Sequence, residues 1–212
     1  MRGHFITFEG GEGAGKSTQI KKLAATLKQA GVPVLLTREP GGSPQAEELR
    51  NLVVKGEADA WDPVSEALIF MTARYHHIEH VIKPALAKGT WVLCDRFYDS
   101  TYVYQGMVKK VDGAWLDMLY RHLYGNFEPD CTLLLDLPAK VGLERTTSRG
   151  GDENRFESLG LAFHEHIREA FLSRAKDCPR FAIIDASNNA DAVQNVISET
   201  VSTRFNLSLE AA

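Results

Sequence analysis

Two patterns of apolar and polar residues alternate along the chain, and their alternation predicts the architecture. Short runs of apolar, aromatic and β-branched residues are typical of buried strands. They occur at residues 4–8, 32–36, 91–94, 132–137 and 181–184. Between them, apolar residues recur every three or four positions, as on one face of a helix. Strands that alternate with helices in this way are typical of a parallel sheet that helices cover on both faces.

The helical segments have recognisable starts. A helix that begins at Pro44 is expected over residues 44–55, and a long one, capped by Asp62, over residues 64–88. The apolar stripe expected on the long helix consists of Ala67, Leu68, Met71, Tyr75, Ile78 and Ile82. Other helices are expected over residues 112–124, 139–148, 159–176 and around 193–201, whereas residues 100–110 are expected to form a polar connection.

The first predicted strand leads into the glycine-rich stretch Gly10-Gly11-Glu12-Gly13-Ala14-Gly15-Lys16-Ser17, with Thr18 behind it. This stretch matches the pattern G-x-x-x-x-G-K-[ST] and lies between a strand and a helix, as that pattern requires. Glycines let backbone N–H groups turn toward phosphate oxygens, and the helix N-terminus adds partial positive charge. Lys16 is expected to reach the β- and γ-phosphates and Ser17 to bind Mg²⁺. The stretch is therefore predicted to bind the phosphates of a nucleotide.

Composition narrows the classes of partner. The 24 basic and 28 acidic side chains give a net charge of −4, so no electrostatic attraction to nucleic acid or to a membrane surface is expected. No run approaches the roughly 18 apolar residues of a membrane-spanning helix. The cysteines, Cys94, Cys131 and Cys178, are far apart in the sequence, which argues against a disulfide framework or a zinc site. We expect a single domain, residues 1–212, in the cytoplasm.

Charged residues follow two other predicted strands. Asp95 comes directly after residues 91–94, as a Walker-B-type acid does, and is expected to hold Mg²⁺ beside Ser17; the alternative is that it only caps the next segment. Arg38 and Arg96 lie just past strand ends, at the edge where ligands bind in such folds. Because arginine forks match phosphate oxygens, a phosphorylated acceptor is predicted next to the glycine-rich stretch.

Aromatic and amide side chains suggest what the acceptor carries. Phe70, Arg74 and His77 share one face of the long helix. Spacing alone favours ordinary core packing for this face; the alternative is that Phe70 stacks on a base whose edge Arg74 recognises. Tyr104 and Gln105 follow Arg96 closely, and because amides can bond base edges, a nucleotide acceptor fits the pattern.

A second glycine-containing segment is rich in arginine. Arg145, Arg149 and Arg155 flank a pair of glycines, which fits a lid over about residues 145–157 and equally a solvated loop between helices. No activated nucleophile is evident in the sequence. A phosphate monoester needs none, because its second pKa lies near ~6 and its oxygen is already anionic at neutral pH. Positioning two phosphates and neutralising the developing charge then suffices.

Together these segments resemble the bacterial thymidylate kinases over almost the whole chain. Residues 8–18 resemble the P-loop of that family, and residues 37–42, T-R-E-P-G-G, its second motif. Residues 95–106 are similar to its signature D-R-Y-x-x-S-x-x-A-Y-Q-G, with Phe97 in place of the usual Tyr and Val103 where Ala is common. The P-loop is shared by many NTPases, whereas the other two motifs in this order are far more specific.

The resemblance implies an α/β, three-layer P-loop kinase fold with a five-stranded, mostly parallel sheet, helices on both faces and a short lid. It implies transfer of the γ-phosphoryl group of ATP to dTMP, giving dTDP and ADP, with Mg²⁺ as cofactor. It also implies a homodimer formed through helices beside the sheet.

The resemblance assigns roles to individual residues. The implied dTMP site consists of Arg38 and Arg96 at the phosphate, Phe70 and Arg74 at the thymine, and Thr101, Tyr104 and Gln105 around base and sugar. Glu12 falls where the family places an acid near the 3′-hydroxyl, and with a tyrosine it would exclude a 2′-hydroxyl. The implied catalytic residues are Lys16, Glu12, Arg96 and Arg149; Arg149 is included because the loop has no cation before Lys16. Asp185-Ala186-Ser187 would border adenine.

Two other functions remain open at this stage. A kinase for a deoxynucleoside or other small metabolite needs a carboxylate base, for which Glu9 or Glu12 is available, but Arg38 and Arg96 would then lack an anionic partner. A nucleotide-dependent switch of the GTPase type is expected to carry N-K-x-D. The nearest match, residues 188–191, lacks the lysine.

Overall fold

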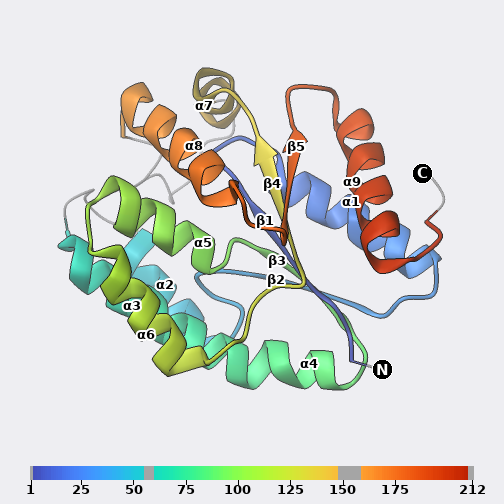
Figure 1. Ribbon diagram of the computed structural model, residues 1–212, viewed down its shortest axis with the longest axis horizontal. Coiled ribbons are helices and arrows are strands. Elements are labelled where there is room, and N and C mark those ends of the chain that lie inside the picture. Colours follow the sequence, from blue (N-terminus) through green and yellow to red (C-terminus); the bar gives the residue numbers. More distant parts are fainter. Residues whose placement is uncertain (1, 55–59, 148–158, 210–212) are drawn as a thin grey trace.

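Five parallel strands form the central sheet of the computed structural model, which describes residues 2–54, 60–147 and 159–209 (Figure 1). In space they follow the order β2-β3-β1-β4-β5. Each neighbouring pair in this sheet is parallel, so the sheet is fully rather than mostly parallel. The strands are β1 (Phe5–Glu9), β2 (Val34–Arg38), β3 (Trp91–Asp95), β4 (Cys131–Asp136) and β5 (Phe181–Asp185). All five predicted strands are thus confirmed, and small differences concern only their ends.

Helices cover both faces of the sheet, which gives the predicted three layers (Figure 1). Helices α1 and α9 lie on one face, and α3, α6 and α8 on the other. The α-helices are α1 (Lys16–Gln29), α2 (Pro44–Val54), α3 (Pro63–His77), α4 (Lys83–Ala87), α5 (Tyr98–Thr101), α6 (Gly113–Tyr124), α7 (Ala139–Thr147), α8 (Leu161–Ala175) and α9 (Ala190–Phe205). Two π-helical segments, η1 (Ile78–Ile82) and η2 (Tyr102–Val108), continue neighbouring helices. Along the described ranges, no helix combines the length and the apolar character needed to cross a bilayer.

The apolar residues of β1 divide between the two faces of the sheet. Ile6 and Phe8 belong to the core that α1 and α9 close, whereas Phe5 belongs to the core beneath α3 and α6. All three side chains are fully buried. Successive side chains of a strand point to opposite faces, so a strand covered on both sides is mostly apolar. The polar exceptions in β1, Thr7 and Glu9, are buried and hydrogen-bonded. This is why the strands appear in the sequence as continuous apolar runs.

The long predicted helix consists of α3, η1 and α4 in succession. Asp62 caps it, and its carboxylate accepts hydrogen bonds from the backbone N–H groups of Val64 and Ser65. The turn widens to a π-helix just before Pro84, because proline has no amide hydrogen and its ring clashes with the carbonyl four residues earlier. Local sequence therefore explains both the start of the helix and its irregular turn.

The predicted apolar stripe of this helix is partly wrong. Ala67, Met71, Ile78 and Ile82 are buried as expected, but Leu68 is 44% exposed and Tyr75 is 46% exposed. Each of these two residues directly follows a buried position, and one residue along a helix turns a side chain by about 100°. Leu68 and Tyr75 consequently lie beside the core and face solvent in the monomer.

Residues 100–108 are helical, which corrects the prediction that residues 100–110 form a polar connection. They belong to α5 and η2, and Val103 in their centre is fully buried. The start of α5 is capped from another strand, because the carboxylate of Glu9 in β1 accepts hydrogen bonds from the backbone N–H groups of Phe97 and Ser100. A cap from so distant a residue leaves no signal in the local sequence.

Candidate active site

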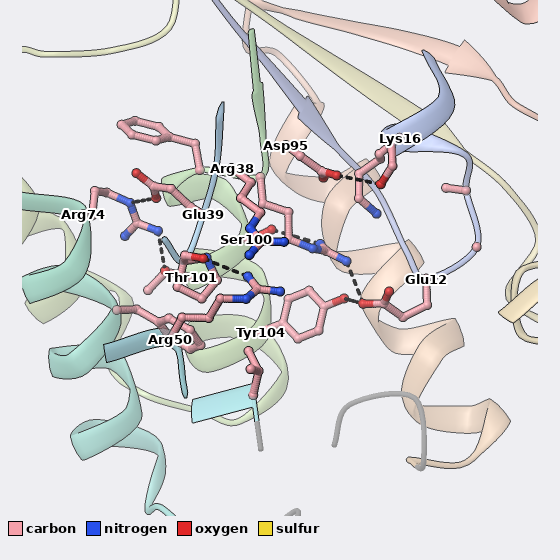
Figure 2. Close-up of a pocket in the computed structure, with 18 of the residues that line it drawn as sticks. Glu12, Lys16, Arg38, Glu39, Arg50, Arg74, Asp95, Ser100, Thr101 and Tyr104 are labelled. Atoms are coloured by element: carbon pink, nitrogen blue, oxygen red, sulfur yellow. Dashed lines mark hydrogen bonds and ion pairs between the residues drawn. The ribbon is translucent and has the colours of Figure 1, made fainter. Parts of the chain in front are cut away.

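The carboxyl ends of the strands open into a cavity of about 450 Å³. Its wall combines the P-loop with residues from β2, α3, β3 and the helical segment after β3. Figure 2 shows Lys16 and Glu12 at one end and Arg74 with Glu39 at the other, with Ser100, Thr101 and Tyr104 between them. The lining residues are Glu12, Gly13, Ala14, Gly15, Lys16, Ser17, Thr18, Arg38, Glu39, Pro40, Arg50, Val54, Phe70, Arg74, Asp95, Arg96, Phe97, Ser100, Thr101, Tyr104, Gln105 and Thr146. All the residues predicted to bind the acceptor line this one cavity.

The P-loop connects β1 to the first turn of α1. The ammonium group of Lys16 donates hydrogen bonds to the carbonyl oxygens of Gly10 (3.0 Å) and Gly11 (2.8 Å), so the lysine curls back over its own loop. Gly13 adopts a φ of 68°, and a Cβ there would lie 2.1 Å from the carbonyl oxygen of Gly142 in α7. Only glycine fits such a position. The loop is therefore held between α1 and the backbone of α7.

Ser17 and Asp95 meet at the floor of the cavity. The Ser17 hydroxyl donates to Oδ2 of Asp95 at 3.0 Å. The other carboxylate oxygen, Oδ1, is buried, and no hydrogen-bond partner for it occurs in the described ranges. A hydroxyl beside a carboxylate with a spare oxygen suits Mg²⁺, which is usually held by one or two protein oxygens together with substrate phosphates and water.

Arg96 lies at the centre of the cavity in a strained backbone conformation. Its φ is 66°, a region that residues other than glycine seldom adopt and that occurs often at functional sites. Its guanidinium donates to the Gly10 carbonyl and to Ser100 (both 3.1 Å), and to Oε1 of Glu12 at 2.7 Å. Tyr104 donates to the same Glu12 oxygen at 3.3 Å. These contacts aim the arginine across the cavity next to the P-loop.

Glu12 carries a negative charge into this cluster. Burial alone would raise the pKa of its carboxyl group, but the charges of Arg96 and Lys16 outweigh burial and hold that pKa below its ordinary value. Glu12 is therefore ionised at neutral pH. An ionised carboxylate accepts hydrogen bonds only, so it suits a hydroxyl donor on a ligand.

Glu9 lies beneath the cavity rather than in its wall. Its carboxylate is fully buried and accepts hydrogen bonds from Phe97 N–H at 2.8 Å and from the Ser100 hydroxyl at 2.6 Å. Burial, together with the nearby charge of Asp99, raises the pKa of Glu9 to about 7. Both carboxylate oxygens are thus committed to the turn that carries Arg96. This placement removes Glu9 as a base for a neutral acceptor hydroxyl.

The other two predicted arginines differ in burial. Arg38 is exposed and pairs with Glu47 at 3.1 Å. Arg74 is only 3% exposed; its Nε donates to Glu39 at 2.6 Å and its Nη2 to Thr101 at 3.1 Å. Phe70, which spacing alone would assign to the core, is half-buried and lines the cavity. A flat side chain beside an anchored guanidinium can receive a ring and recognise one edge of it.

Three residues of this site were not identified from the sequence. Glu39 is buried and accepts hydrogen bonds from Arg74 and from His77. Arg50 of α2 lines the cavity and donates to the Pro40 carbonyl at 2.7 Å. Glu66 is fully buried behind the cavity. A carboxylate just after a strand was a usable signal for Glu39, whereas for the two helix residues only the packing of the helix decides which face meets the site.

Other predicted features lie away from the cavity or outside the described ranges. Val103, which departs from the signature of the family, packs in the core against α8 and β4 and is not among the residues that line the cavity. Arg149, Arg155 and most of the predicted lid at 145–157 lie outside the described residues. After β5, Asp185 accepts hydrogen bonds from the backbone and the hydroxyl of Ser187.

A parallel sheet with a P-loop after its first strand, and arginines across the same cavity, defines a P-loop phosphotransferase. Residues 8–197 match the family model described as Thymidylate kinase. The thymidylate kinase of Caulobacter vibrioides is 54% identical over 97% of this chain and 99% of that protein. That of Magnetococcus marinus is 52% identical over 97% and 98%. A crystal structure of thymidylate kinase from Ehrlichia chaffeensis has a TM-score of 0.76 at 33% identity, covering 95% of this chain and 99% of that one. The chain belongs to the thymidylate kinase family and is an enzyme.

Proposed function

We propose that this enzyme transfers the γ-phosphoryl group of ATP to dTMP, giving dTDP and ADP. The observation that supports this best is one cavity with a P-loop at one end and, facing it, Arg96, an anchored Arg74 and the half-buried ring of Phe70. Family membership supports the same reaction. No observation favours a nucleoside kinase or a nucleotide-dependent switch.

The P-loop forms the donor half of the site. Gly10, Gly11, Glu12, Gly13, Ala14, Gly15, Lys16, Ser17 and Thr18 would surround the ATP phosphates. Lys16 would exchange its two bonds to loop carbonyls for the β- and γ-phosphate oxygens. Ser17 and Asp95 would hold Mg²⁺, which supplies positive charge to the transferring phosphoryl group when bound.

The opposite half receives dTMP. Arg38 and Arg96 would bind its phosphate, while Phe70 would stack on thymine and Arg74 would donate to its edge. The remaining contacts to base and sugar would come from Thr101, Tyr104, Gln105 and Glu12. Glu12 would accept from the 3′-hydroxyl. The dTMP phosphate is already anionic at neutral pH, so no general base is needed.

A cation from the lid would complete the catalytic set, with Arg149 in that role. The P-loop supplies no arginine or lysine before Lys16, and Arg96, which pairs with Glu12, would be engaged with the phosphate of the acceptor. Charge on the phosphoryl oxygens during transfer therefore needs a further partner. Arg145, at the end of α7, belongs to the described part of the proposed lid.

Replacement of Arg149 tests this role. In Arg149→Ala we expect kcat to fall by about 10²- to 10³-fold with little change in the affinity for dTMP, because the contact forms mainly in the transition state. Steady-state kinetics and dTMP titration measure the two quantities. An unchanged kcat would remove Arg149 from the catalytic set.

Exposed apolar residues on two helices indicate how the enzyme assembles. We propose a homodimer through α3 and α6, since Val64, Leu68 and Tyr75 of α3 and Met118 of α6 expose between 44% and 55% of their surface. Exposed apolar residues that gather on neighbouring helices are typical of interaction surfaces. We also propose that residues 1–212 work as one domain and that the enzyme acts in the cytoplasm.

A panel of acceptors tests the overall reaction. With ATP and Mg²⁺, dTMP is expected to be phosphorylated at least about 10²-fold more efficiently than thymidine, because Arg38 and Arg96 need an anionic partner. Coupled ADP release with dTMP, dUMP, dCMP and thymidine gives the kcat/KM values. A preference for thymidine would contradict the proposal and favour a nucleoside kinase. Tight GTP binding with slow turnover and no acceptor would favour a switch.

A further inference from the structure

Glu66 and Gln105 form a buried hydrogen-bonded pair behind the acceptor end of the cavity. The amide nitrogen of Gln105 donates to Oε1 of Glu66 at 2.6 Å, and Lys109 donates to the same oxygen at 2.8 Å. Glu66 is fully buried, and Gln105 is 1% exposed and lines the cavity. The pair thus connects α3 to η2 just behind the surface that the ligand meets.

The pair fixes which end of the Gln105 amide is a donor and which an acceptor. An amide has N–H donors on one side and a carbonyl acceptor on the other, and a half-turn of the group exchanges them. Oε1 of Glu66 accepts from the Lys109 ammonium, and as a carboxylate oxygen it can only accept. The end of the Gln105 amide that faces this oxygen is therefore the nitrogen. The carbonyl oxygen of Gln105 is then the end of the amide that Glu66 does not hold, in a side chain that lines the cavity.

Arg74 has a fixed polarity for a similar reason. Its guanidinium only donates, and Glu39 and Thr101 hold it in place. The acceptor end of the cavity therefore offers a fixed donor and a fixed acceptor. Thymine and uracil complement this order, since a carbonyl oxygen lies next to a ring N–H. Cytosine presents an amino group next to a bare ring nitrogen, which would leave both protein groups without partners.

We propose that Glu66 is a positioning residue that sets the hydrogen-bond polarity of Gln105 and thereby makes the site select a base with a ring N–H over cytosine. The inference rests on the proposed function. Glu66 acts through Gln105 rather than on the substrate itself. Its effect is consequently on the choice between bases, more than on phosphoryl transfer.

Replacement of Glu66 by its amide tests the proposal. In Glu66→Gln the charge that holds the Lys109 ammonium is lost. Once this ammonium turns toward solvent, the new amide can face Gln105 with either end, so the Gln105 amide can turn. We expect the ratio of kcat/KM for dTMP to that for dCMP to fall by about tenfold. The ratio for dTMP to dUMP should not change, because both bases carry the ring N–H. Glu79→Gln, which removes a carboxylate paired with Lys83 on the same run of helix, is the matched control and should leave every ratio unchanged.

A second variant separates polarity from packing. The double change Glu66→Gln and Gln105→Glu keeps one carboxylate and one amide but exchanges their positions, so residue 105 again offers an acceptor to the cavity. It should return the dTMP to dCMP ratio toward the unmodified value, and it decides the matter if Glu66→Gln alone does not fold. Activities on dTMP and dCMP that fall in parallel, or a ratio that the exchange leaves low, would overturn the proposal. Failure of the unmodified enzyme to use dTMP would instead contradict the proposed function.

Discussion

Removal of the Arg96 side chain is expected to lower kcat/KM for dTMP by about 10³-fold, which corresponds to about 4 kcal/mol. Arg96 would contact the acceptor phosphate through a charge-assisted fork, and such contacts are among the strongest in proteins. Arg96→Ala also leaves the Glu12 carboxylate without its 2.7 Å partner, close to where the anionic phosphate must bind. We therefore expect the KM for dTMP to rise much more than the KM for ATP.

Two further variants test whether the loss of activity is specific to Arg96 and to the shape of its guanidinium group. Arg204→Ala removes an arginine that binds main-chain carbonyls at residues 179 and 180, before β5 and away from the cavity, and should behave like the unmodified enzyme. Arg96→Lys keeps the charge but loses the planar fork, so its activity should lie between that of the unmodified enzyme and that of Arg96→Ala. An equal loss of dTMP and ATP affinity in Arg96→Ala would contradict the acceptor-site assignment.

The replacement Asp99→Asn is expected to lower the free energy of unfolding by about 3–5 kcal/mol. Asp99 is 1% exposed and accepts two hydrogen bonds from Arg180, both 2.7 Å long, and one from Arg174. Without the carboxylate, two partly buried guanidinium groups lose their counter-charge. Urea denaturation at pH 7 measures the change. The same substitution at Asp191, an exposed partner of Lys22, should cost less than about 1 kcal/mol.

The contribution of Asp99 to the free energy of unfolding depends on pH with a definite sign. Burial would raise the pKa of Asp99, but the hydrogen bonds and charges of Arg180 and Arg174 outweigh it and lower that pKa. Its contribution is therefore present above the ordinary carboxyl pKa of about 4 and is lost as the pH falls through the lower folded value. The difference in stability between Asp99→Asn and the unmodified protein should shrink from pH 5 to pH 3. Glu9, with a pKa raised to about 7, stays protonated in the folded enzyme over that window. A difference as small as that of Asp191→Asn would show that the buried pair contributes little.

The sequence predicts those parts of the site that depend on local backbone or on topology. The P-loop needs glycines and a Lys-Ser pair in consecutive positions, so it is readable directly. Arg38 and Arg96 follow strands, and parallel strands bring their carboxyl ends to one edge whatever their order in the sheet. The resemblance to a known family added Phe70 and Arg74, for which helical spacing alone favoured the core.

What the sequence does not reveal depends on contacts between distant segments. The helical conformation of residues 100–108 depends on Glu9, which lies in β1. Glu66 looks like a solvated helix residue until α3 and η2 are packed together. Leu68 and Tyr75 looked like core residues because spacing alone does not place an apolar side chain at the border between the buried and the exposed face of a helix. In each case the deciding partner is far away in the chain, so no local pattern carries the information.

The contact between Gly13 and Gly142 couples the position of the phosphate loop to that of α7. A side chain at Gly13 would meet the backbone of α7, and one at Gly142 would lie 2.2 Å from the carbonyl oxygen of Glu12. The phosphate loop and α7 thus touch main chain to main chain, with no side chain between them to deform. Arg149 follows the end of α7 closely in the sequence, and a tilt of this helix toward the loop displaces the loop itself. Helix α7, which leads into the proposed lid, is in this way fixed against the backbone that we propose holds the ATP phosphates.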